Sequence, residues 1–481
     1  MRTMGEGQVV VASNRGPLSF ALSDSGRLSA RRGGGGLVSG LSAVTGETDV
    51  LWVCAALGDA DRQAARHAGG RLDRSGYDTG GTAVRMLNIP PAQFARAYNA
   101  VANSTLWFCH HMLFDTPTKP VFDATARREW ASYRAYNAAF ADALARDAGN
   151  RARTLVQDYH LTLTPLMLRQ RRPDLRIAHF SHTPWAPPDY FRVLPDEMAR
   201  EVLRGVLGAD HVGFLTRRWA RAFMDCCADV LDADVDLRNG AIAHGGRVTR
   251  VGVHPLGVDG GALRARAAEA DVAARERALR ERVGDRALIV RVDRTELSKN
   301  IVRGLAAYRE LLASYPQWRG RVTHVAFAYP SRHDLPEYRE YTAAVQRMAG
   351  QIIDEFGTAD WEPLVLEVND DYPRSLAAFR LADVLLVNPT RDGMNLVAKE
   401  GPVLSERDAA LVLSREAGAA AELGDDALLV NPYDVSGTAR ALHEGLSMDR
   451  AERGARRGRL ADAATALPPQ RWFTDQLTAL G

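Results

Sequence analysis

The sequence predicts an α/β protein built from two doubly wound, Rossmann-like domains that face each other across a cleft. Short apolar, β-branched runs alternate with longer amphipathic stretches, as in parallel sheets covered by helices on both faces. This rhythm restarts after residue 286, behind a segment punctuated by Pro and Gly. A chain of 481 residues is also too long for a single core.

Each expected strand is a short apolar run in the printed sequence. The first domain contributes the runs 9–12, 50–54, 154–157, 177–180, 211–214 and 248–253. The second contributes 287–292, 322–328, 364–368, 384–387, 410–413 and 428–430. Between the two sets, residues 253–259 lead into an Ala-, Arg- and Glu-rich stretch that predicts one helix over about 261–282. We therefore place the domains at 1–257 and from 258 onward.

Bulk composition excludes several classes of partner. The net charge is +2 and no basic block is interleaved with aromatic residues, so neither nucleic acid nor a membrane surface is expected as a partner. The N-terminus lacks a long apolar stretch, which predicts a cytoplasmic protein. The four cysteines form no C-x-x-C pair, and we expect all of them to be reduced and buried. Oligomeric state is not encoded visibly, and a homodimer is one option.

Lysine is rare in this chain. Of 61 basic residues only Lys119, Lys299 and Lys399 are lysines. Lysine presents a compact point charge whereas arginine presents a wide fork, so a tight site against phosphate oxygens can require lysine. Chance survival of three lysines is the alternative. The latter two lie in motifs that follow strands.

Residues 388–395 follow the run 384–387 and form an expected turn from strand to helix. Gly393 permits close approach of a ligand to the backbone, and amides at the start of the next helix can bind an anion. Asp392 and Glu400 stand eight residues apart, where one carboxylate could meet a sugar ring and the other the ribose of a nucleotide sugar. The alternative, a helix cap formed by Asp392, is equally consistent with the sequence.

Three more strand ends carry polar residues. Arg294 and Lys299 follow the run 287–292 and could neutralise a leaving pyrophosphate, with surface charge as the alternative. Asp158 and His182 also follow strand runs and could bind reacting groups, although a lone histidine is more often a buried structural residue. Four glycines at 33–36 precede an expected helix, either as a phosphate loop or as a plain flexible loop. The full dinucleotide-binding spacing is missing there.

With these motifs in hand, the chain resembles the trehalose-6-phosphate synthases over nearly its whole length. The resemblance rests on five strings: VASNR at 11–15, QDYH at 157–160, SK at 298–299, RDGMNLVAKE at 391–400 and VNPYD at 430–434. It implies the GT-B fold, transfer with retention of configuration, and no metal or other cofactor. It also implies that the donor-binding domain ends near residue 465 and that a helix at about 466–481 returns to the first, acceptor-binding domain.

The resemblance assigns roles residue by residue. Arg294 and Lys299 would hold the donor diphosphate, His182 would contact the exocyclic hydroxyl of the transferred ring, and Asp158 would face the reacting end of the acceptor; we take these four as the catalytic set. The rest of the donor site would comprise Gly35, Gly36, Asp392, Gly393, Met394, Asn395, Leu396, Val397 and Glu400. The phosphate of the acceptor would be clamped by Arg15, Tyr98 and Arg332.

Two departures from the family pattern bear on the substrate. The synthases carry Gly-Trp-Ser-Gly after the second strand, where this chain has CAALG at 54–58, and they carry RLDYSKG where this chain has RTELSKN at 294–300. These changes resemble the pseudo-glycosyltransferases of validamycin-type antibiotic biosynthesis. That resemblance implies a GDP-linked cyclitol donor (GDP-valienol), a phosphorylated aminocyclitol acceptor (validamine 7-phosphate), and a C–N bond formed with release of GDP. The runner-up is a trehalose-6-phosphate synthase or a relative with another phosphorylated acceptor.

Two hypotheses from other classes stay open on sequence alone. A catalytically silent nucleotide-sugar sensor could share the fold, although it has no need of the full cation pair. A dehydrogenase could share it too, but only by analogy of fold. Release of a nucleoside diphosphate from a donor excludes the first, and failure to bind a nicotinamide cofactor excludes the second.

Overall fold

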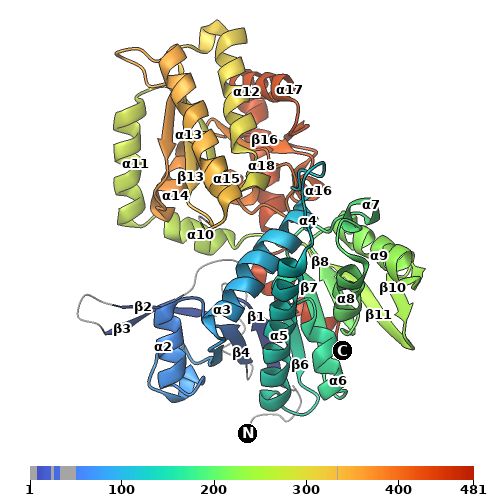
Figure 1. Ribbon diagram of the computed structural model, residues 1–481. Coiled ribbons are helices and arrows are strands. Elements are labelled where there is room, and N and C mark those ends of the chain that lie inside the picture. Colours follow the sequence, from blue (N-terminus) through green and yellow to red (C-terminus); the bar gives the residue numbers. More distant parts are fainter. Residues whose placement is uncertain (1–7, 23–26, 33–49, 333) are drawn as a thin grey trace. The chain divides into compact units, whose positions relative to one another are not determined.

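A computed structural model describes residues 8–22, 27–32, 50–332 and 334–481, which divide into two compact units (Figure 1). The first unit is Met1–Pro255 together with Pro469–Gly481, and the second is Leu256–Pro468. The division falls after Pro255, whereas the sequence analysis placed it after residue 257.

The first unit is built on a nine-stranded sheet in the order β5-β4-β1-β6-β7-β8-β11-β10-β9. The seven strands from β5 to β11 are parallel, and β10 and β9 add an antiparallel edge. Across the parallel part of the sheet, successive strands of the chain are added on one side from β1 to β5 and on the other side from β6 onward. The strand order therefore reverses between β1 and β6. The strands are β1 (Val9–Ser13), β4 (Val50–Ala55), β5 (Ala83–Leu87), β6 (Arg153–Gln157), β7 (Arg176–Ser181), β8 (His211–Phe214), β9 (Asp234–Asp236), β10 (Ala241–His244) and β11 (Arg247–Val253).

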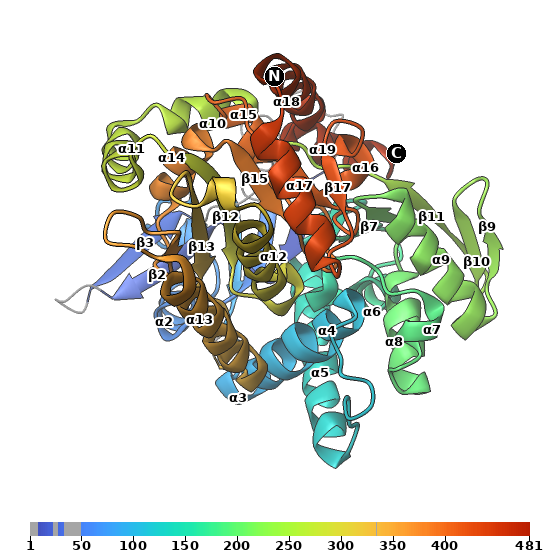
Figure 2. The same ribbon diagram turned by 90° about the horizontal axis from the view of Figure 1, so that it is seen from above.

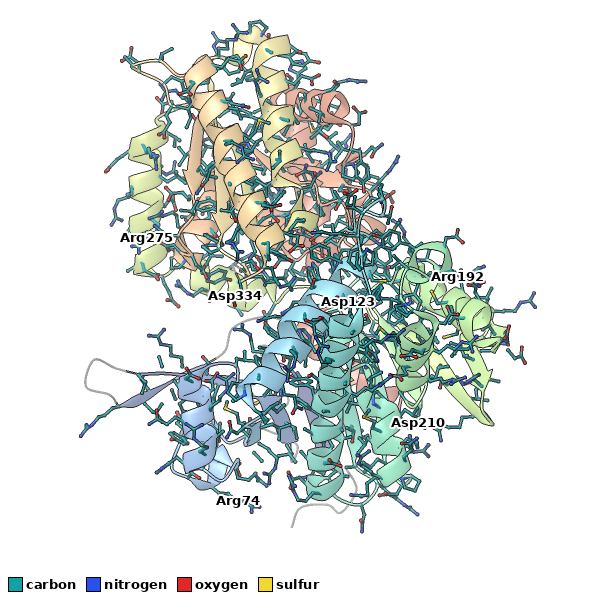
Figure 3. The ribbon with its side chains drawn as sticks, in the orientation of Figure 1. Arg74, Asp123, Arg192, Asp210, Arg275 and Asp334 are labelled. Carbon is teal, nitrogen blue, oxygen red and sulfur yellow. The ribbon has the colours of Figure 1, made fainter. Side chains whose placement is uncertain are left out.

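The other elements of this unit include a separate antiparallel hairpin, β2 (Leu18–Leu22) with β3 (Leu28–Arg32). The helices are α2 (Asp59–His67), η1 (Leu72–Arg74), α3 (Pro91–Ala95), η2 (Arg96–Leu106), α4 (Trp107–His111), α5 (Ala124–Asp147), η3 (Tyr159–Leu161), α6 (Thr164–Arg171), α7 (Pro188–Phe191), α8 (Asp196–Val206), α9 (Arg217–Leu231) and α19 (Pro469–Thr478). The long α5 is capped at its N-terminus by Asp123, labelled in Figure 3, whose carboxylate accepts hydrogen bonds from the amides of Thr125 and Ala126. Such a cap satisfies amides that the first turn leaves without partners.

The second unit is built on a fully parallel six-stranded sheet in the order β14-β13-β12-β15-β16-β17. The strands are β12 (Ala287–Arg294), β13 (Val322–Tyr329), β14 (Leu364–Glu367), β15 (Val384–Val387), β16 (Ala410–Ser414) and β17 (Leu428–Val430). In chain order this is 3-2-1-4-5-6, the doubly wound arrangement, which reverses between β12 and β15. The central strands β13 and β15 are buried throughout, which explains why they read as unbroken apolar runs.

Helices cover both faces of this second sheet (Figure 2). The helices α12, α13 and α17 form one layer, while α10, α11, α14, α15 and α18 form the other. Their bounds are α10 (Gly260–Ala267), α11 (Ala270–Val283), η4 (Leu297–Lys299), α12 (Ile301–Ser314), η5 (Pro316–Trp318), α13 (Pro336–Phe356), α14 (Tyr372–Leu381), α15 (Val397–Leu404), α16 (Ala420–Leu423), α17 (Val435–Ser447) and α18 (Arg450–Thr465).

One helix prediction was wrong. The stretch 261–282, expected as a single helix, is the two helices α10 and α11, which are separated at Ala268 and Glu269. Glu269 has extended backbone angles, and Arg266 bridges the break by pairing with Asp271. No Gly or Pro marks the break, so composition gave no signal for it.

All four cysteines are buried free thiols, as expected. Burial raises the pKa of Cys54, Cys226 and Cys227, so these thiols stay protonated at neutral pH. Among the described residues, no helix is both long and apolar enough to cross a membrane.

Candidate active site

The donor residues predicted in the second unit lie where the second sheet reverses its order. Arg294 ends β12, Lys299 ends the short η4 that follows it, and Asp392 follows β15, the neighbouring strand. The Nζ of Lys299 lies 2.6 Å from Oδ2 of Asp392, and Nδ2 of Asn395 donates to the same oxygen at 3.1 Å. Ligands of doubly wound sheets bind in this crevice, because the helices before and after it lie on opposite faces.

Carboxylates keep Lys299 protonated although its side chain is largely buried. Burial lowers the pKa of Lys299, but the carboxylates of Asp392, Asp293 and Glu296 outweigh it and hold the pKa above its usual value. Asp293 is itself buried and ion-paired to Arg291 at 2.8 Å, and Arg291 also donates to the carbonyl of Lys299 at 3.0 Å. The hydrogen bond from Arg291 thus fixes the backbone of Lys299. The charged ammonium group of Lys299 can bind an anion.

The loop 391–396 is fixed by close packing of the backbone. A Cβ atom on Gly418 would lie 1.9 Å from the carbonyl oxygen of Gly393, so only glycine fits there. The amide of Ala419 donates to the carbonyl of Met394 at 2.8 Å, and Asn395 adopts a positive φ of 78°. Leu396 then caps α15, whose first residue is Val397. The predicted donor amides therefore belong to one rigid turn before a helix.

Glu400 lies in the first turn of α15 and has an unusual carboxylate. Burial raises its pKa to about 7. No ion pair or hydrogen bond to this carboxylate is found among the described residues that would offset the cost of burial. A buried carboxylate of this kind gains most from a ligand that donates hydroxyl hydrogen bonds.

Arg332, predicted to clamp the acceptor, lies in the second unit on the loop after β13. It has a positive φ of 47°, and its guanidinium donates to the hydroxyl of Tyr338 at 2.7 Å. The carboxylate of Glu296 contacts both Arg294 and Ser331, the residue before Arg332. Within the second unit, the structure thus brings Arg332 together with the donor cations.

The first unit gathers a second set of predicted residues at its own order reversal. Asp158 follows β6 with a positive φ of 73°, and its Oδ1 accepts from the amide of His182 at 3.1 Å. The ring of His182 lies 2.9 Å, at Nε2, from Oε1 of Gln157. Burial lowers the pKa of His182 to about 4, so the ring is neutral at pH 7. With Nε2 donating to Gln157, Nδ1 is a hydrogen-bond acceptor and not an acid.

Tyr98 and Arg15, two predicted acceptor residues, lie on other segments of the first unit. Tyr98 lies on η2, an eleven-residue π-helix, and its ring stacks between Phe94 and His160 at centroid distances of 5.1 and 5.6 Å. Nδ1 of His160 lies 3.9 Å from Oδ2 of Asp158. Arg15 follows β1 and is exposed, with its backbone carbonyl held by the hydroxyl of Ser13. π-Helices are rare and are frequently found at functional sites.

Four non-glycine residues of these sets share a positive φ. They are Asp158, Asn300, Arg332 and Asn395, and each lies in a turn at the carboxyl end of a strand. A non-glycine residue there costs on the order of 1–3 kcal/mol, which persists only where the surrounding structure enforces it. The turns that hold the predicted site residues thus contain four of the eight non-glycine residues with positive φ in the described part of the chain.

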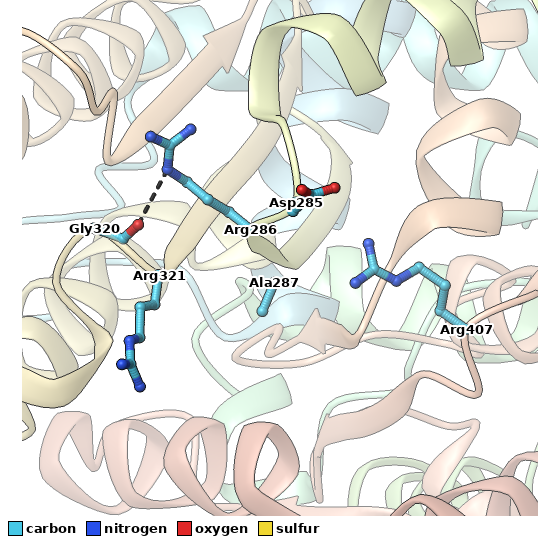
Figure 4. A pocket seen from close by; sticks show the side chains of 6 residues that line it. All are labelled: Asp285, Arg286, Ala287, Gly320, Arg321 and Arg407. Carbon is cyan, nitrogen blue, oxygen red and sulfur yellow. Dashed lines mark hydrogen bonds between the residues drawn. The ribbon is translucent and has the colours of Figure 1, made fainter.

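A cavity of about 580 Å³ lies at the other end of the second sheet (Figure 4). It is lined by Asp285, Arg286, Ala287, Gly320 and Arg321, at the starts of β12 and β13, and by Arg407, which precedes β16. Arg286 donates to the carbonyl of Gly320 at 3.1 Å, and Arg407 pairs with Asp383. The side chains diverge in Figure 4, so this cavity holds no convergent polar groups and we assign it no substrate.

The remaining predictions concern the glycine loop, metal binding and Lys399. Gly35 and Gly36 lie outside the described residues. No group of three or more potential ligands for a metal ion occurs in the described part of the chain. Lys399 proves structural, because its fully buried Nζ donates to Glu422 at 2.8 and 2.9 Å and to the carbonyl of Leu256 at 2.8 Å.

With this geometry established, comparison with known proteins identifies the family. The family model of glycosyltransferase family 20 matches residues 7–481. The chain belongs to glycosyltransferase family 20. It is therefore a transferase, as the sequence analysis predicted.

Curated relatives of this family 20 protein include trehalose-6-phosphate synthases. It is 35% identical to the trehalose-6-phosphate synthase of Mycobacterium tuberculosis, covering 99% of this chain and 95% of that protein. It is 33% identical to the bifunctional trehalose-6-phosphate synthase/phosphatase of Thermoproteus tenax, covering 98% of this chain. Only 63% of the latter protein is matched, so the chain spans less than two thirds of its length.

Solved structures confirm the predicted GT-B class with two Rossmann-like domains. One is the E. coli trehalose-6-phosphate protein bound with UDP-2-fluoro glucose, at a TM-score of 0.86 and 28% identity over 98% of both chains. Another is the α,α-trehalose-phosphate synthase of Burkholderia xenovorans in complex with glucose-6-phosphate, at 0.84 and 27% identity over 98% of this chain and 100% of that one.

Sequence reasoning missed several residues that support the site. Gly418 and Glu296 carry no motif of their own, and Gln157 and His160 were read only as neighbours of Asp158. Glu296 had one available signal, since it stands between two predicted cations in a segment that departs from the family pattern. Gly418 became evident only through the 1.9 Å approach to Gly393.

Proposed function

We propose that this transferase moves a glucosyl group from a nucleotide-diphosphate donor to a sugar phosphate, as a trehalose-6-phosphate synthase does. The observation that carries the proposal is the contact of Lys299 with Asp392 at 2.6 Å, at the order reversal of the second sheet. It joins a cation suited to a leaving diphosphate with a carboxylate suited to ring hydroxyls. In the proposed assignment, the second unit binds the donor and the first unit binds the acceptor.

Departure of the diphosphate is the difficult step, because negative charge accumulates on the leaving oxygens. Arg294 and Lys299 would stabilise that charge, and the amides from Gly393 to Val397 would hold the donor in place. Asp392 would exchange its contact with Lys299 for hydroxyls of the transferred ring. These two cations supply positive charge at the leaving group from the chain itself.

The acceptor would be oriented mainly by residues of the first unit. Arg15, Tyr98 and Arg332 would clamp its phosphate, and Asp158 would receive a hydrogen bond from its reacting end. The neutral ring of His182 would accept a hydrogen bond at Nδ1 from the exocyclic hydroxyl of the donor ring. With no carboxylate acting as nucleophile, the departing diphosphate would guide attack to the face it leaves and accept the proton, giving retention.

A second candidate rests on the end of β4. Ala55 and Ala56 are buried where the synthases carry a tryptophan, and Cys54 packs so tightly that a Cβ atom on Gly16 would lie 2.4 Å from its Sγ. Loss of that aromatic favours a different acceptor. In this candidate the chain is a validoxylamine A 7'-phosphate synthase that joins GDP-valienol to validamine 7-phosphate through a C–N bond. An allylic cation would then replace the oxocarbenium ion.

Product analysis by mass spectrometry separates the two candidates. The enzyme is incubated with UDP- or GDP-glucose plus glucose 6-phosphate, and in parallel with GDP-valienol plus validamine 7-phosphate. We expect a phosphorylated disaccharide from the first pair, with one nucleoside diphosphate released per product. Turnover of the second pair alone would replace the first proposal with the second.

Donor binding should depend on pH through Glu400. Ribose hydroxyls donate to the ionised carboxylate, whose pKa is about 7 in the free protein, so binding favours loss of its proton. Affinity for a nucleoside diphosphate should therefore rise with pH up to about 7 and weaken by up to about tenfold per pH unit below it.

Calorimetric titration from pH 5.5 to 8.5 measures this dependence, with Glu400→Gln as the matched control. The variant should lose the component due to Glu400 and keep the titration of the ligand phosphate. An identical pH profile in both proteins would show that Glu400 does not meet the ribose.

A further inference from the structure

Glu296 is a fully buried carboxylate among the cations of the donor unit. Its side chain is 0% exposed, and its Oε1 lies 3.2 Å from Nη2 of Arg294 and 3.0 Å from the hydroxyl of Ser331. Ser331 directly precedes Arg332. One oxygen therefore ties the loop after β12, which carries Arg294 and Lys299, to the loop after β13, which carries Arg332.

The charge of Glu296 is balanced by cations more than by hydrogen bonds. Its second oxygen, Oε2, has no hydrogen-bond partner among the described residues. Burial raises the pKa of Glu296, but Arg294, Arg332 and Lys299 outweigh that effect and lower the pKa to about 2. At any pH near neutrality, Glu296 thus carries a permanent negative charge beside three cations, of which Lys299 is also paired with Asp392.

We propose that Glu296 is an internal counter-ion that competes with bound phosphate for these cations and limits how tightly the site holds its diphosphate product. The inference rests on the proposed function in taking Arg294, Lys299 and Arg332 as the phosphate-binding groups. Glu296 itself touches neither substrate in this account.

The physical reason is that Glu296 cannot leave when a ligand arrives. Without ligand, its charge offsets the repulsion among three cations gathered at two loop ends. With a diphosphate bound, the same charge lies within a few ångströms of the phosphate oxygens and repels them in a poorly screened interior. The residue thus stabilises the empty site and destabilises the occupied one, which favours release of the product.

The test is Glu296→Gln, which keeps size and hydrogen bonding and removes the charge. We expect the Kd for UDP or GDP to fall about tenfold, since a unit charge at this range in protein is worth at least that factor. We expect the melting temperature of the ligand-free variant to fall below that of the wild type. Added nucleoside diphosphate should then close the gap, because it supplies the missing charge.

Higher affinity together with lower stability identifies Glu296 as a counter-ion. Loss of an ordinary structural residue lowers affinity and stability together. Glu296→Asp, which keeps the charge, should bind within about threefold of the wild type, since about 0.7 kcal/mol is a small change. Glu340→Gln, an exposed carboxylate on α13, should change neither quantity.

Unchanged or weaker binding by Glu296→Gln would overturn the proposal. So would a variant that stays unfolded in phosphate buffer with saturating nucleoside diphosphate, because charge replacement should then restore it. The binding result is independent of turnover. Tighter binding in an enzyme that transfers no glucose would keep this inference and reject the proposed function, while normal transfer without tighter binding would do the reverse.

Discussion

Replacing Lys299 with methionine is expected to reduce the turnover of donor and acceptor by about 10²–10³-fold, the usual cost of losing one stabiliser of transition-state charge. Methionine keeps most of the packing of a side chain that is only 17% exposed, but it places no charge near the leaving diphosphate. Asp392 then loses the cation at 2.6 Å that offsets its charge, so its carboxylate repels the donor diphosphate more strongly. Steady-state rates at saturating donor and acceptor measure the effect.

Two further variants define what the Lys299 result means. Lys299→Arg should restore little activity, because a wide guanidinium does not fit the 2.6 Å approach of a single Nζ to Asp392. Arg309→Met removes an exposed cation from α12 in the same unit and should leave turnover unchanged. If Lys299→Met kept more than a tenth of wild-type turnover, Lys299 would not bear the leaving group.

Replacing Lys399 with methionine is expected to lower the free energy of unfolding by about 3–5 kcal/mol, because it leaves one partner of a buried ion pair uncompensated. The ammonium group is fully buried and is held by three oxygens, two of Glu422 and one of Leu256. Leu256 is the first residue of the second unit, so the lysine also fixes where that unit begins. Urea unfolding followed by circular dichroism gives the change.

The matched control for this prediction is the double variant Lys399→Met with Glu422→Leu. Removing both charges together should recover much of the lost stability, since apolar pairs of similar size often replace buried ion pairs without penalty. A double variant no more stable than the single one would mean that the lysine acts through the carbonyl of Leu256 or through packing.

Most of the parallel strands could be predicted because burial on both faces selects unbroken apolar runs. β13 and β15 are buried at every position, and they appear in the sequence as 322–328 and 384–387. The parallel edge strand β5, the hairpin of β2 and β3, and the antiparallel strands β9 and β10 were not predicted. They are short and partly exposed, and their alternating pattern is weak over so few residues.

Site residues could be predicted where a charged residue follows the end of a strand. They were harder to predict where the role of a residue depends on its tertiary contacts. Arg294, Lys299 and Asp392 follow strands that become neighbours in the sheet, so their meeting follows from topology. The rarity of lysine indicated Lys299 as a site residue, but it indicated Lys399 as well. A buried ion pair such as Lys399–Glu422 can require a compact cation just as a phosphate site does, so rarity alone does not separate the two roles. Arg332 was assigned to the acceptor alone, and only the three-dimensional contacts place it beside Glu296.

The central claim is tested most directly by following both products of a single reaction by ³¹P and ¹³C NMR. The wild-type enzyme is given glucose 6-phosphate and UDP- or GDP-glucose labelled at the anomeric carbon. The account predicts that nucleoside diphosphate and a phosphorylated disaccharide appear in equal amounts, with the labelled carbon in the α configuration of the donor. Inversion at that carbon, release of nucleoside diphosphate with free glucose, or no release from either donor would contradict it.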